Sequence, residues 1–585
     1  MLTFLGFKSC KFLVILKALW PYLWNSNKKV RYKLIGSVVF NILAIISSIS
    51  TPVLFGRMID SFSSSHSSSF SHSWFLTSLI AYVGVWSFSK VFLYLREIMM
   101  FPVMEKAIRL LAFHLFQHIQ LLPFHYHLKR KTGEVTGVME TAIESFPPIV
   151  FSLVFTLGPL IVEGVCIFWI ITFICGVYYS LILTAGLTFY IVVTRWGFAK
   201  AFRSLRQANF SHLETTSKIV DSFLNFSSIK YFHTYDFEFN KMNQTLETRE
   251  NKISGSLIKN QMIRVYQTLI LSLSFLLLMI FTGYNLVLNK LSLGEFIMIH
   301  TYMLQFTLPL EGFGQIFQML NQSFVKMEKA LRIFKNPLGT KQGSIMLDKK
   351  NPLHVVFENV WFGYQKNTPI LKGISFELLP NQTLAIVGET GSGKSTIVSL
   401  LLGFVEPWKG RILVNGQDLK NLNQENFINL IGVVPQDVTL FNDKISHNIL
   451  YANMSASKKM LDDTLDIASL KKTIQKLPHG LETIVGERGM QLSGGEKQRI
   501  GLARAIIRKP KLYIFDEATS SLDSKTERKV IKNIESISKS ASTLIISHNL
   551  STISFADKII LLEKGLIQDK SYDSLIKEGK ALQAN

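Results

Sequence analysis

The stretch Leu384-Ala-Ile-Val-Gly388-Glu-Thr-Gly-Ser-Gly-Lys394-Ser395-Thr396 decides the fold of the C-terminal part of the chain. Its apolar start predicts a buried strand, the glycine-rich run predicts a tight loop, and the following Ile397–Leu402 predicts a helix. The pattern GxxxxGK[ST] between a strand and a helix is typical of a phosphate-binding loop. Backbone N–H groups there surround the phosphates, the lysine reaches the terminal phosphates, and the next hydroxyl binds magnesium. We therefore predict an α/β domain of the P-loop ATPase type, with these residues at the nucleotide: Gly388, Glu389, Thr390, Gly391, Ser392, Gly393, Lys394, Ser395 and Thr396.

A second apolar strand, Leu512-Tyr-Ile-Phe, ends in two acidic residues, Asp516 and Glu517. An aspartate beside a phosphate-binding loop suits a magnesium ligand, and the glutamate after it suits a general base for an attacking water. A further strand, Thr543–Ile546, precedes His548. Taken alone, a histidine at such a place is usually structural.

The composition indicates that the rest of the chain is embedded in a membrane. The 585 residues carry a net charge of +22, yet 48% are hydrophobic and only 18% are charged. A chain this apolar is not a disordered basic tail, and its low charged fraction argues against a nucleic-acid binder. Residues 1–340 hold 31 basic and 16 acidic side chains, a balance of 31 − 16 = +15, and residues 341–585 hold 32 and 25, a balance of +7. The second part is therefore predicted to be a soluble domain. Three cysteines, Cys10, Cys166 and Cys175, make no disulfide framework.

Apolar runs of about the 20 residues needed to cross a bilayer predict an α-helical membrane domain with six spans. Short connections alternate with long basic ones at 95–145 and 194–264, which places these segments and both termini in the cytoplasm. Apolar residues in the long segments recur at helical spacing, so the spans are predicted to continue as helices beyond the membrane. The predicted spans are Leu34–Phe55, Trp74–Tyr94, Phe146–Ile170, Val177–Val193, Val265–Val287 and Phe296–Leu320.

The first 33 residues contain seven basic side chains and no acidic one. They suit either an interfacial helix on the cytoplasmic face or a signal or transit peptide. The absence of a small-residue cleavage pattern, and of arginine before Arg31, favours the interfacial helix. We expect a bacterial inner membrane, with the mitochondrial inner membrane as the alternative. The predicted organisation is an N-terminal segment at 1–33, a membrane domain at 34–335, a linker at 336–350 and a nucleotide-binding domain at 351–585.

The run Leu492-Ser-Gly-Gly-Glu-Lys-Gln-Arg499 resembles the signature motif of ATP-binding cassette (ABC) transporters. Residues 350–585 as a whole are similar to the nucleotide-binding domain of that family. The resemblance implies ATP and Mg²⁺ as cofactors and an active ATPase. It also implies that Tyr364 stacks on adenine, that Gln436 senses magnesium and couples to the membrane domain, and that His548 contacts the γ-phosphate.

One membrane domain and one cassette make a half-transporter, and the resemblance implies that two cassettes stack head to tail. Each ATP would then lie between Lys394 of one chain and a signature serine of the other, so a homodimer is expected and a heterodimer is the alternative. Coupling helices would lie near Leu121–Val135 and Asn225–Glu238, and Val485–Gly489 resembles an exporter-specific loop. The remaining residues expected at the dimeric nucleotide site are Ser493, Gly494, Gly495 and Asp523.

Several short motifs in the membrane domain resemble exporters of iron–sulfur and heavy-metal-tolerance type, which carry glutathione-linked compounds. They are Leu95-Arg-Glu97, Phe124-His-Tyr-His-Leu128, Thr132-Gly133, Asp221-Ser-Phe-Leu-Asn-Phe226, Lys230-Tyr-Phe232 and Leu308-Pro-Leu310. An arginine pair that faces glutathione carboxylates in that subfamily falls here on Ala201 and Leu205. Loss of two guanidinium groups removes bidentate recognition of carboxylates.

The expected substrate is a small-molecule or peptide-like solute, either a glutathione-related compound bound in a different way or another anionic compound. The alternatives are a multidrug, lipid or peptide exporter and a non-transporting regulator driven by nucleotide. The residues predicted to border the substrate cavity are Tyr190, Arg264, Gln267 and Gln318.

Overall fold

A computed structural model describes residues 9–569 apart from 25–26, 65–71, 124–125, 127–131, 338–342, 349, 366, 487–488 and 549. The chain forms two compact units. One comprises Met1–Gln120 and Thr132–Asn336, and the other comprises Leu121–Lys131 and Pro337–Asn585. The division after Asn336 lies next to the end predicted for the membrane domain.

The first unit is entirely helical in its described part, as predicted. Three of its helices contain 49, 48 and 53 residues, more than twice the length of a membrane span, because apolar periodicity continues into the basic segments between spans. Its elements are α1 (Ser9–Leu23), α2 (Lys28–Ser64), α3 (His72–Gln120), α5 (Thr132–Val150), a π-helical segment (Phe151–Leu157), α6 (Gly158–Ile174), α7 (Val177–Leu224), α8 (Phe226–Phe232), α9 (Tyr235–Val287) and α10 (Leu293–Ile333).

Within the described residues, five stretches are long and apolar enough to cross a membrane. They cover five of the six predicted spans, and only a minority of their residues is buried, as expected for helices with surfaces that face lipid. The sixth predicted span, Phe296–Leu320, lies inside α10 and includes polar residues such as Gln305 and Gln315. The number of six spans therefore stays a prediction. The five stretches are Lys28–Phe62, Leu76–Gln120, Gly137–Ile174, Val177–Gly197 and Tyr235–Val287.

The predicted third span is built from three pieces. Pro147 and Pro148 lie at the end of α5, where neither can donate a backbone hydrogen bond. The chain then makes the π-helical segment before Gly158 and Pro159 begin α6. A continuous apolar run in the sequence therefore becomes a helix with an irregular middle.

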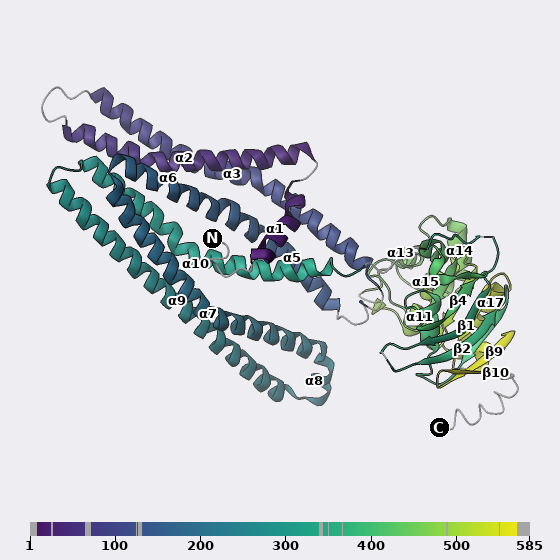
Figure 1. The fold of residues 1–585 in the computed structure, drawn as a ribbon. Helices are drawn as coiled ribbons and strands as arrows, with labels where there is room; N and C mark the ends of the chain where they lie inside the picture. Colours follow the sequence, from purple (N-terminus) through teal and green to yellow (C-terminus); the bar gives the residue numbers. More distant parts are fainter. Residues whose placement is uncertain are drawn as a thin grey trace. The chain divides into compact units, whose positions relative to one another are not determined.

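Helices α2 and α3 lie side by side, and so do α7 and α9 (Figure 1). Two buried clusters hold the unit together. One joins α1, α3, α5 and α10, and the other joins α2, α6, α7, α9 and α10. Helix α1 buries Ile15, Leu19 and Leu23 in the first cluster, which gives the predicted N-terminal segment a fixed place on the helical unit.

The end of α2 is bound to the start of α10. The two carboxylate oxygens of Asp60 accept hydrogen bonds from Ser292 Oγ and Gly294 N, each at 2.7 Å. Ser292 is also the N-cap of α10 and forms a capping box with Glu295. A Cβ atom on Gly294 would lie 2.0 Å from the carbonyl oxygen of Gly56, so the close approach requires glycine there.

The second unit contains a six-stranded sheet of order β10-β9-β3-β8-β7-β6, in which all neighbours except β10 and β9 are parallel. A four-stranded antiparallel sheet has the order β2-β1-β4-β5. This confirms the predicted α/β domain. The strands are β1 (Val355–Phe362), β2 (Leu371–Leu378), β3 (Thr383–Val387), β4 (Lys409–Val414), β5 (Gln417–Asp418), β6 (Ile431–Val434), β7 (Leu512–Asp516), β8 (Ser542–Ile546), β9 (Lys558–Glu563) and β10 (Leu566–Asp569). The helices are α11 (Lys394–Leu401), α12 (Gln424–Asn429), α13 (Ile445–Leu450), α14 (Lys458–Ile467), α15 (Lys471–Gln475), α16 (Gly494–Ile506) and α17 (Ser524–Ser538).

Alternate residues of the parallel strands point into two separate cores. Leu512 and Ile514 belong to one cluster, whereas Tyr513 and Phe515 belong to the other. Both faces of the sheet are thus covered, which explains why its strands read as continuous apolar runs. Cassette packing begins within the predicted linker, because Ile345 bridges to Leu422 and Leu347 is buried.

Candidate functional site

The predicted phosphate-binding loop connects β3 to α11. Gly391 and Gly393 have φ values of 86° and 110°, which favour glycine because a Cβ atom would be strained there. The side chain of Lys394 is folded against the loop and donates to the carbonyl oxygens of Gly388 at 2.7 Å and Glu389 at 2.9 Å. The sequence pattern therefore produces the expected strand, loop and helix, with the lysine amino group inside the loop.

The loop contains a buried polar atom that calls for an external partner. Ser392 is 8% exposed, and its Oγ has no hydrogen-bond partner within the described part of the chain. An unsatisfied buried hydroxyl costs about 1–3 kcal/mol, so a ligand oxygen at this position would be stabilised. The loop thus fits a phosphate group on evidence independent of the sequence pattern.

Asp516 lies at the end of β7, beside the loop. It accepts a hydrogen bond from Ser395, and it is 8% exposed. Burial and the neighbouring charge of Glu517 raise the pKa of Asp516, although Ser395 and Lys394 oppose the shift. Burial lowers the pKa of Lys394, while Glu517 and Asp516 act in the opposite direction. The serine and aspartate predicted to bind magnesium are therefore in contact.

Glu517 is held by residues from two other loops. Gln436 Nε2 donates to its Oε2 at 2.7 Å, and His548 Nδ1 lies 3.3 Å from its Oε1. The backbone of Glu517 has a φ of 47°, which is uncommon for a residue with a side chain. Gln436, Glu517 and His548 follow the neighbouring parallel strands β6, β7 and β8, so they meet at the carboxyl edge of the sheet, where ligands of open α/β sheets bind.

The other predicted nucleotide contacts lie on the surface of the cassette. Tyr364 follows β1, is 49% exposed, and has its ring edge-on to Phe362 at 5.2 Å between centroids. Ser493 is the exposed N-cap of α16, with Gly494 and Gly495 in the first turn of the helix. Asp523 is the exposed N-cap of α17 and accepts from Thr526 N at 3.0 Å. Exposure leaves these residues available for a ligand or a second chain.

The structure also reveals polar residues that the sequence reasoning missed. Gln498 is 3% exposed and binds the loop that follows Glu517. Asn448 is fully buried and bonded to Arg504. The sequence carries little signal for them, because glutamine, asparagine and arginine are ordinarily exposed.

Two of the predicted cavity residues connect membrane helices. Tyr190 is 1% exposed, and its hydroxyl donates to the carbonyl oxygen of Leu310 on α10. Gln267 is 3% exposed, and its Nε2 donates to Thr194 Oγ1 on α7 at 2.6 Å. Their polar groups are thus occupied by neighbouring helices, so their place in a substrate cavity stays a prediction.

The other two cavity residues lie on facing sides of α9 and α10. Arg264 donates to Gln315 Oε1 at 3.4 Å, and Gln318 accepts from Asn260 at the same distance. The side chains of Ala201 and Leu205 lie outside the described residues, although both positions belong to α7.

Of the predicted coupling segments, the second contains the short helix α8. The first, Leu121–Val135, falls partly outside the described residues, as do Glu487 and Arg488 of the exporter-specific loop. Their coupling roles stay predictions.

Comparisons with known proteins agree with this arrangement. The family described as ABC transporter matches residues 371–520, and the ABC transporter transmembrane region matches residues 34–310. The chain is 33% identical over 580 residues to the mitochondrial iron–sulfur clusters transporter ATM1 of Kluyveromyces lactis, covering 97% of this chain and 80% of that protein. It is 32% identical over 577 residues to the ATM1-type heavy metal exporter of Novosphingobium aromaticivorans, covering 96% and 93%.

A solved structure of a bacterial Atm1-family ABC exporter with ATP bound has the same fold. The TM-score is 0.86 at 30% identity, and the match covers 95% of this chain and 99% of that chain. The chain therefore belongs to the ABC transporter family, as a multi-pass membrane half-transporter of the exporter type in which ATP hydrolysis by the cassette drives export.

Proposed function

We propose that Glu517 is the general base of ATP hydrolysis. The observation that carries this proposal is the hydrogen bond from Gln436 to Glu517 beside the phosphate-binding loop, with His548 on the other carboxylate oxygen. A carboxylate held in this way accepts a proton from water as the water attacks the terminal phosphate. Lys394 and the loop N–H groups hold the phosphates, and His548 acts at the γ-phosphate.

Ser395, Asp516 and Gln436 are proposed to hold Mg²⁺ together with the phosphates of ATP. Among the described residues, no group of three or more His, Cys, Asp and Glu side chains suits a metal. This agrees with magnesium, which keeps several waters and uses one or two carboxylates plus substrate phosphates. When bound, Mg²⁺ would neutralise charge that develops on the phosphate oxygens.

The test of this site is the Glu517→Gln variant of the full chain in lipid nanodiscs. We expect ATP binding to persist and steady-state phosphate release to be lost, because an amide does not accept the proton. His354→Gln is a matched control, since His354 pairs with Glu377 on the antiparallel sheet. Full turnover in Glu517→Gln would refute the assignment of the base.

A homodimer is proposed as the working unit. Ser493 and Asp523 cap exposed helix ends, which fits contacts made with a second cassette. Tyr364, also exposed, would stack on the adenine. Cross-linking tests this proposal: single cysteines introduced at Ser493 and Thr390 in two tagged copies should form an intermolecular disulfide only when ATP is present. No disulfide between the two tagged copies in the presence of ATP would contradict it.

The exported solute is proposed to be a small anionic compound. The guanidinium of Arg264 is half-buried on α9, and the hydrogen-bond partner described for it, Gln315, is neutral. The relatives named above carry iron–sulfur clusters or heavy metals, but the arginine pair of glutathione recognition is replaced here by Ala201 and Leu205. Oxidised glutathione should therefore stimulate the ATPase weakly or not at all.

Uptake into inside-out vesicles tests the charge of the substrate. An anionic dye should enter with ATP, and Arg264→Gln should reduce its uptake while leaving a cationic dye of similar size unaffected. Uptake of the cationic dye alone would favour a multidrug exporter. Nucleotide-driven motion without uptake of any solute would favour a regulator.

A further inference from the structure

Helix α16 contacts two of the three loops that supply groups to the proposed hydrolytic site, the loops after β6 and β7. Its N-cap is Ser493, the serine of the signature motif. Gln498, Gly501 and Arg504 follow at intervals of three residues, so they lie along one side of the helix. Each of them contacts a loop that follows a strand of the parallel sheet.

Gln498 binds the loop after β7. Its Nε2 donates to Ser520 Oγ at 3.0 Å and, more weakly, to the carbonyl oxygen of Glu517 at 3.4 Å. Its Oε1 accepts from Ser521 N at 3.0 Å. The left-handed backbone of Glu517 is strained for a residue with a side chain, so this loop depends on support from its surroundings.

Gly501 packs against the loop after β6. A Cβ atom at position 501 would lie 2.6 Å from Val438 Cγ2, closer than real Cβ contacts allow. Val438 is two residues from Gln436 in the sequence. The loop after β6 carries Gln436 and is termed the glutamine loop. The absence of a side chain at position 501 of α16 therefore sets how closely this loop approaches the helix.

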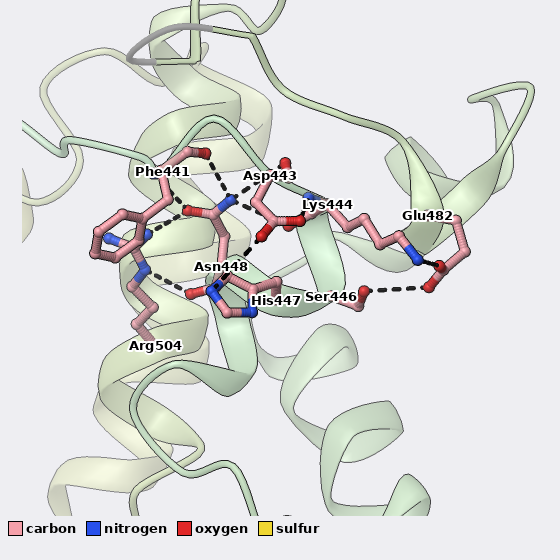
Figure 2. Close-up of polar contacts among 8 residues, drawn as sticks. All are labelled: Phe441, Asp443, Lys444, Ser446, His447, Asn448, Glu482 and Arg504. Atoms are coloured by element: carbon pink, nitrogen blue, oxygen red, sulfur yellow. Dashed lines mark hydrogen bonds and ion pairs between the residues drawn. The ribbon is translucent and has the colours of Figure 1, made fainter. Parts of the chain in front are cut away.

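Arg504 binds the same loop one turn further along, and Figure 2 shows its contact with Asn448. Its Nη1 donates to the carbonyl oxygen of Thr439 at 2.8 Å, and its Nε donates to that of Asn448 at 2.6 Å. Asn448, which is fully buried, in turn bonds both backbone groups of Phe441, at 2.9 and 3.0 Å. Arg504 thus binds the loop from Thr439 to Phe441 to α16 directly at Thr439, and through Asn448 of α13 at Phe441.

We propose that α16 is a rigid spacer that sets the distance between Gln436 and Glu517, with Gln498 and Arg504 as positioning residues. Six residues of α-helix separate the two anchors by about 9 Å, and a helix resists changes in that length. The Gln436–Glu517 hydrogen bond forms only if the loops after β6 and β7 both stay bound to α16. Since Ser493 is the N-cap of α16, a second cassette that closes on the signature would move both loops together. This inference rests on the roles proposed above for Gln436 and Glu517.

The test compares the steady-state kinetics of ATPase variants of the full chain in nanodiscs. Gln498→Met and Arg504→Met keep the size of the side chain but lose its hydrogen bonds. We expect kcat to fall on the order of ten- to a hundredfold, because small misplacements of catalytic groups have effects of that size. KM for ATP should change by no more than about threefold, since the phosphate loop is untouched. Arg504→Lys, which reaches fewer acceptors, should fall between the wild type and Arg504→Met.

Asn533→Ala is the matched control for a purely structural effect. Asn533 on α17 donates to the carbonyl oxygen of Ile467 at 2.6 Å, a comparable part-buried bond that touches neither loop. We expect it to lower the thermal midpoint without lowering kcat. An equal loss of kcat in Asn533→Ala and Gln498→Met at equal thermal shifts would overturn the proposal.

If the methionine variants do not fold, a second pair of substitutions tests the proposal, by adding side-chain volume at position 501 and removing it at position 438. Gly501→Ala should lower kcat by pushing Val438 and the glutamine loop away, and adding Val438→Ala should restore most of it. No rescue in the double variant would overturn the spacer role. Glu517→Gln and Gln436→Ala are measured alongside: if they retain full turnover, the proposed catalytic roles fail. If they lose turnover while the α16 variants do not, only the spacer inference fails.

Discussion

The bond between α2 and α10 gives a prediction whose magnitude follows from the structure. Asp60 accepts two hydrogen bonds, from Ser292 Oγ and Gly294 N. Hydrogen bonds to charged groups contribute about 1.5–3 kcal/mol each, and the positive end of the α10 dipole adds about 0.3–1 kcal/mol. Asp60→Asn keeps one acceptor oxygen, so we expect a loss of about 2 kcal/mol. Asp60→Ala removes both acceptors and should lose more.

The assay is SDS-induced unfolding of the protein in mixed micelles, arranged as a double-mutant cycle of Asp60→Asn and Ser292→Ala. The cycle removes the separate cost of losing the Ser292 cap, and we expect a coupling energy of about 1–2 kcal/mol. Glu214→Gln is the control, because Glu214 forms an exposed ion pair with Lys218 and its loss should not be measurable. Additivity of the two substitutions within about 0.5 kcal/mol would refute the reasoning.

Three further predictions concern the cassette and the helical core. Tyr364→Ala should raise KM for ATP roughly fivefold or more with little change in kcat, because it removes a stacking surface, and Tyr364→Phe should behave like the wild type. Because its pKa is raised, Asp516 should bind a proton at a higher pH than an ordinary aspartate. Titration of the ATP complex with Mn²⁺ should therefore show weaker metal binding as the pH falls. A metal affinity that does not depend on pH would contradict this. Phe146→Ala should destabilise the membrane unit by about 3–5 kcal/mol in SDS unfolding, since Phe146 is fully buried, whereas truncation of the exposed Phe173 should not.

Much of the fold could be predicted because its signals are local in the sequence. The phosphate-binding loop is one contiguous run, and the end of β7 marks Asp516 and Glu517 without knowledge of the fold, whereas His548 was assigned through the resemblance to a family. Apolar runs likewise marked the membrane helices. The irregular π-helical segment after Pro148 was missed, because the apolar composition there continues unbroken.

The positioning residues could not be predicted, because their partners are remote in the sequence. Gln498 is 19 residues from Glu517, and Arg504 is 65 residues from Thr439. An apolar–polar pattern places such side chains on the solvent side of a helix. Only the packing of α16 against two loops buries them.

The sequence by itself determined that this chain has a helical membrane part and a P-loop cassette, because glycine spacing, strand ends and apolar runs act within a few residues. The tertiary structure decided which polar groups meet. It brought Gln436 and His548 to Glu517, joined Asp60 to the start of α10, and occupied the polar groups of Tyr190 and Gln267 in bonds between helices. These contacts depend on the order of strands and the packing of helices, and neither is encoded in any one segment.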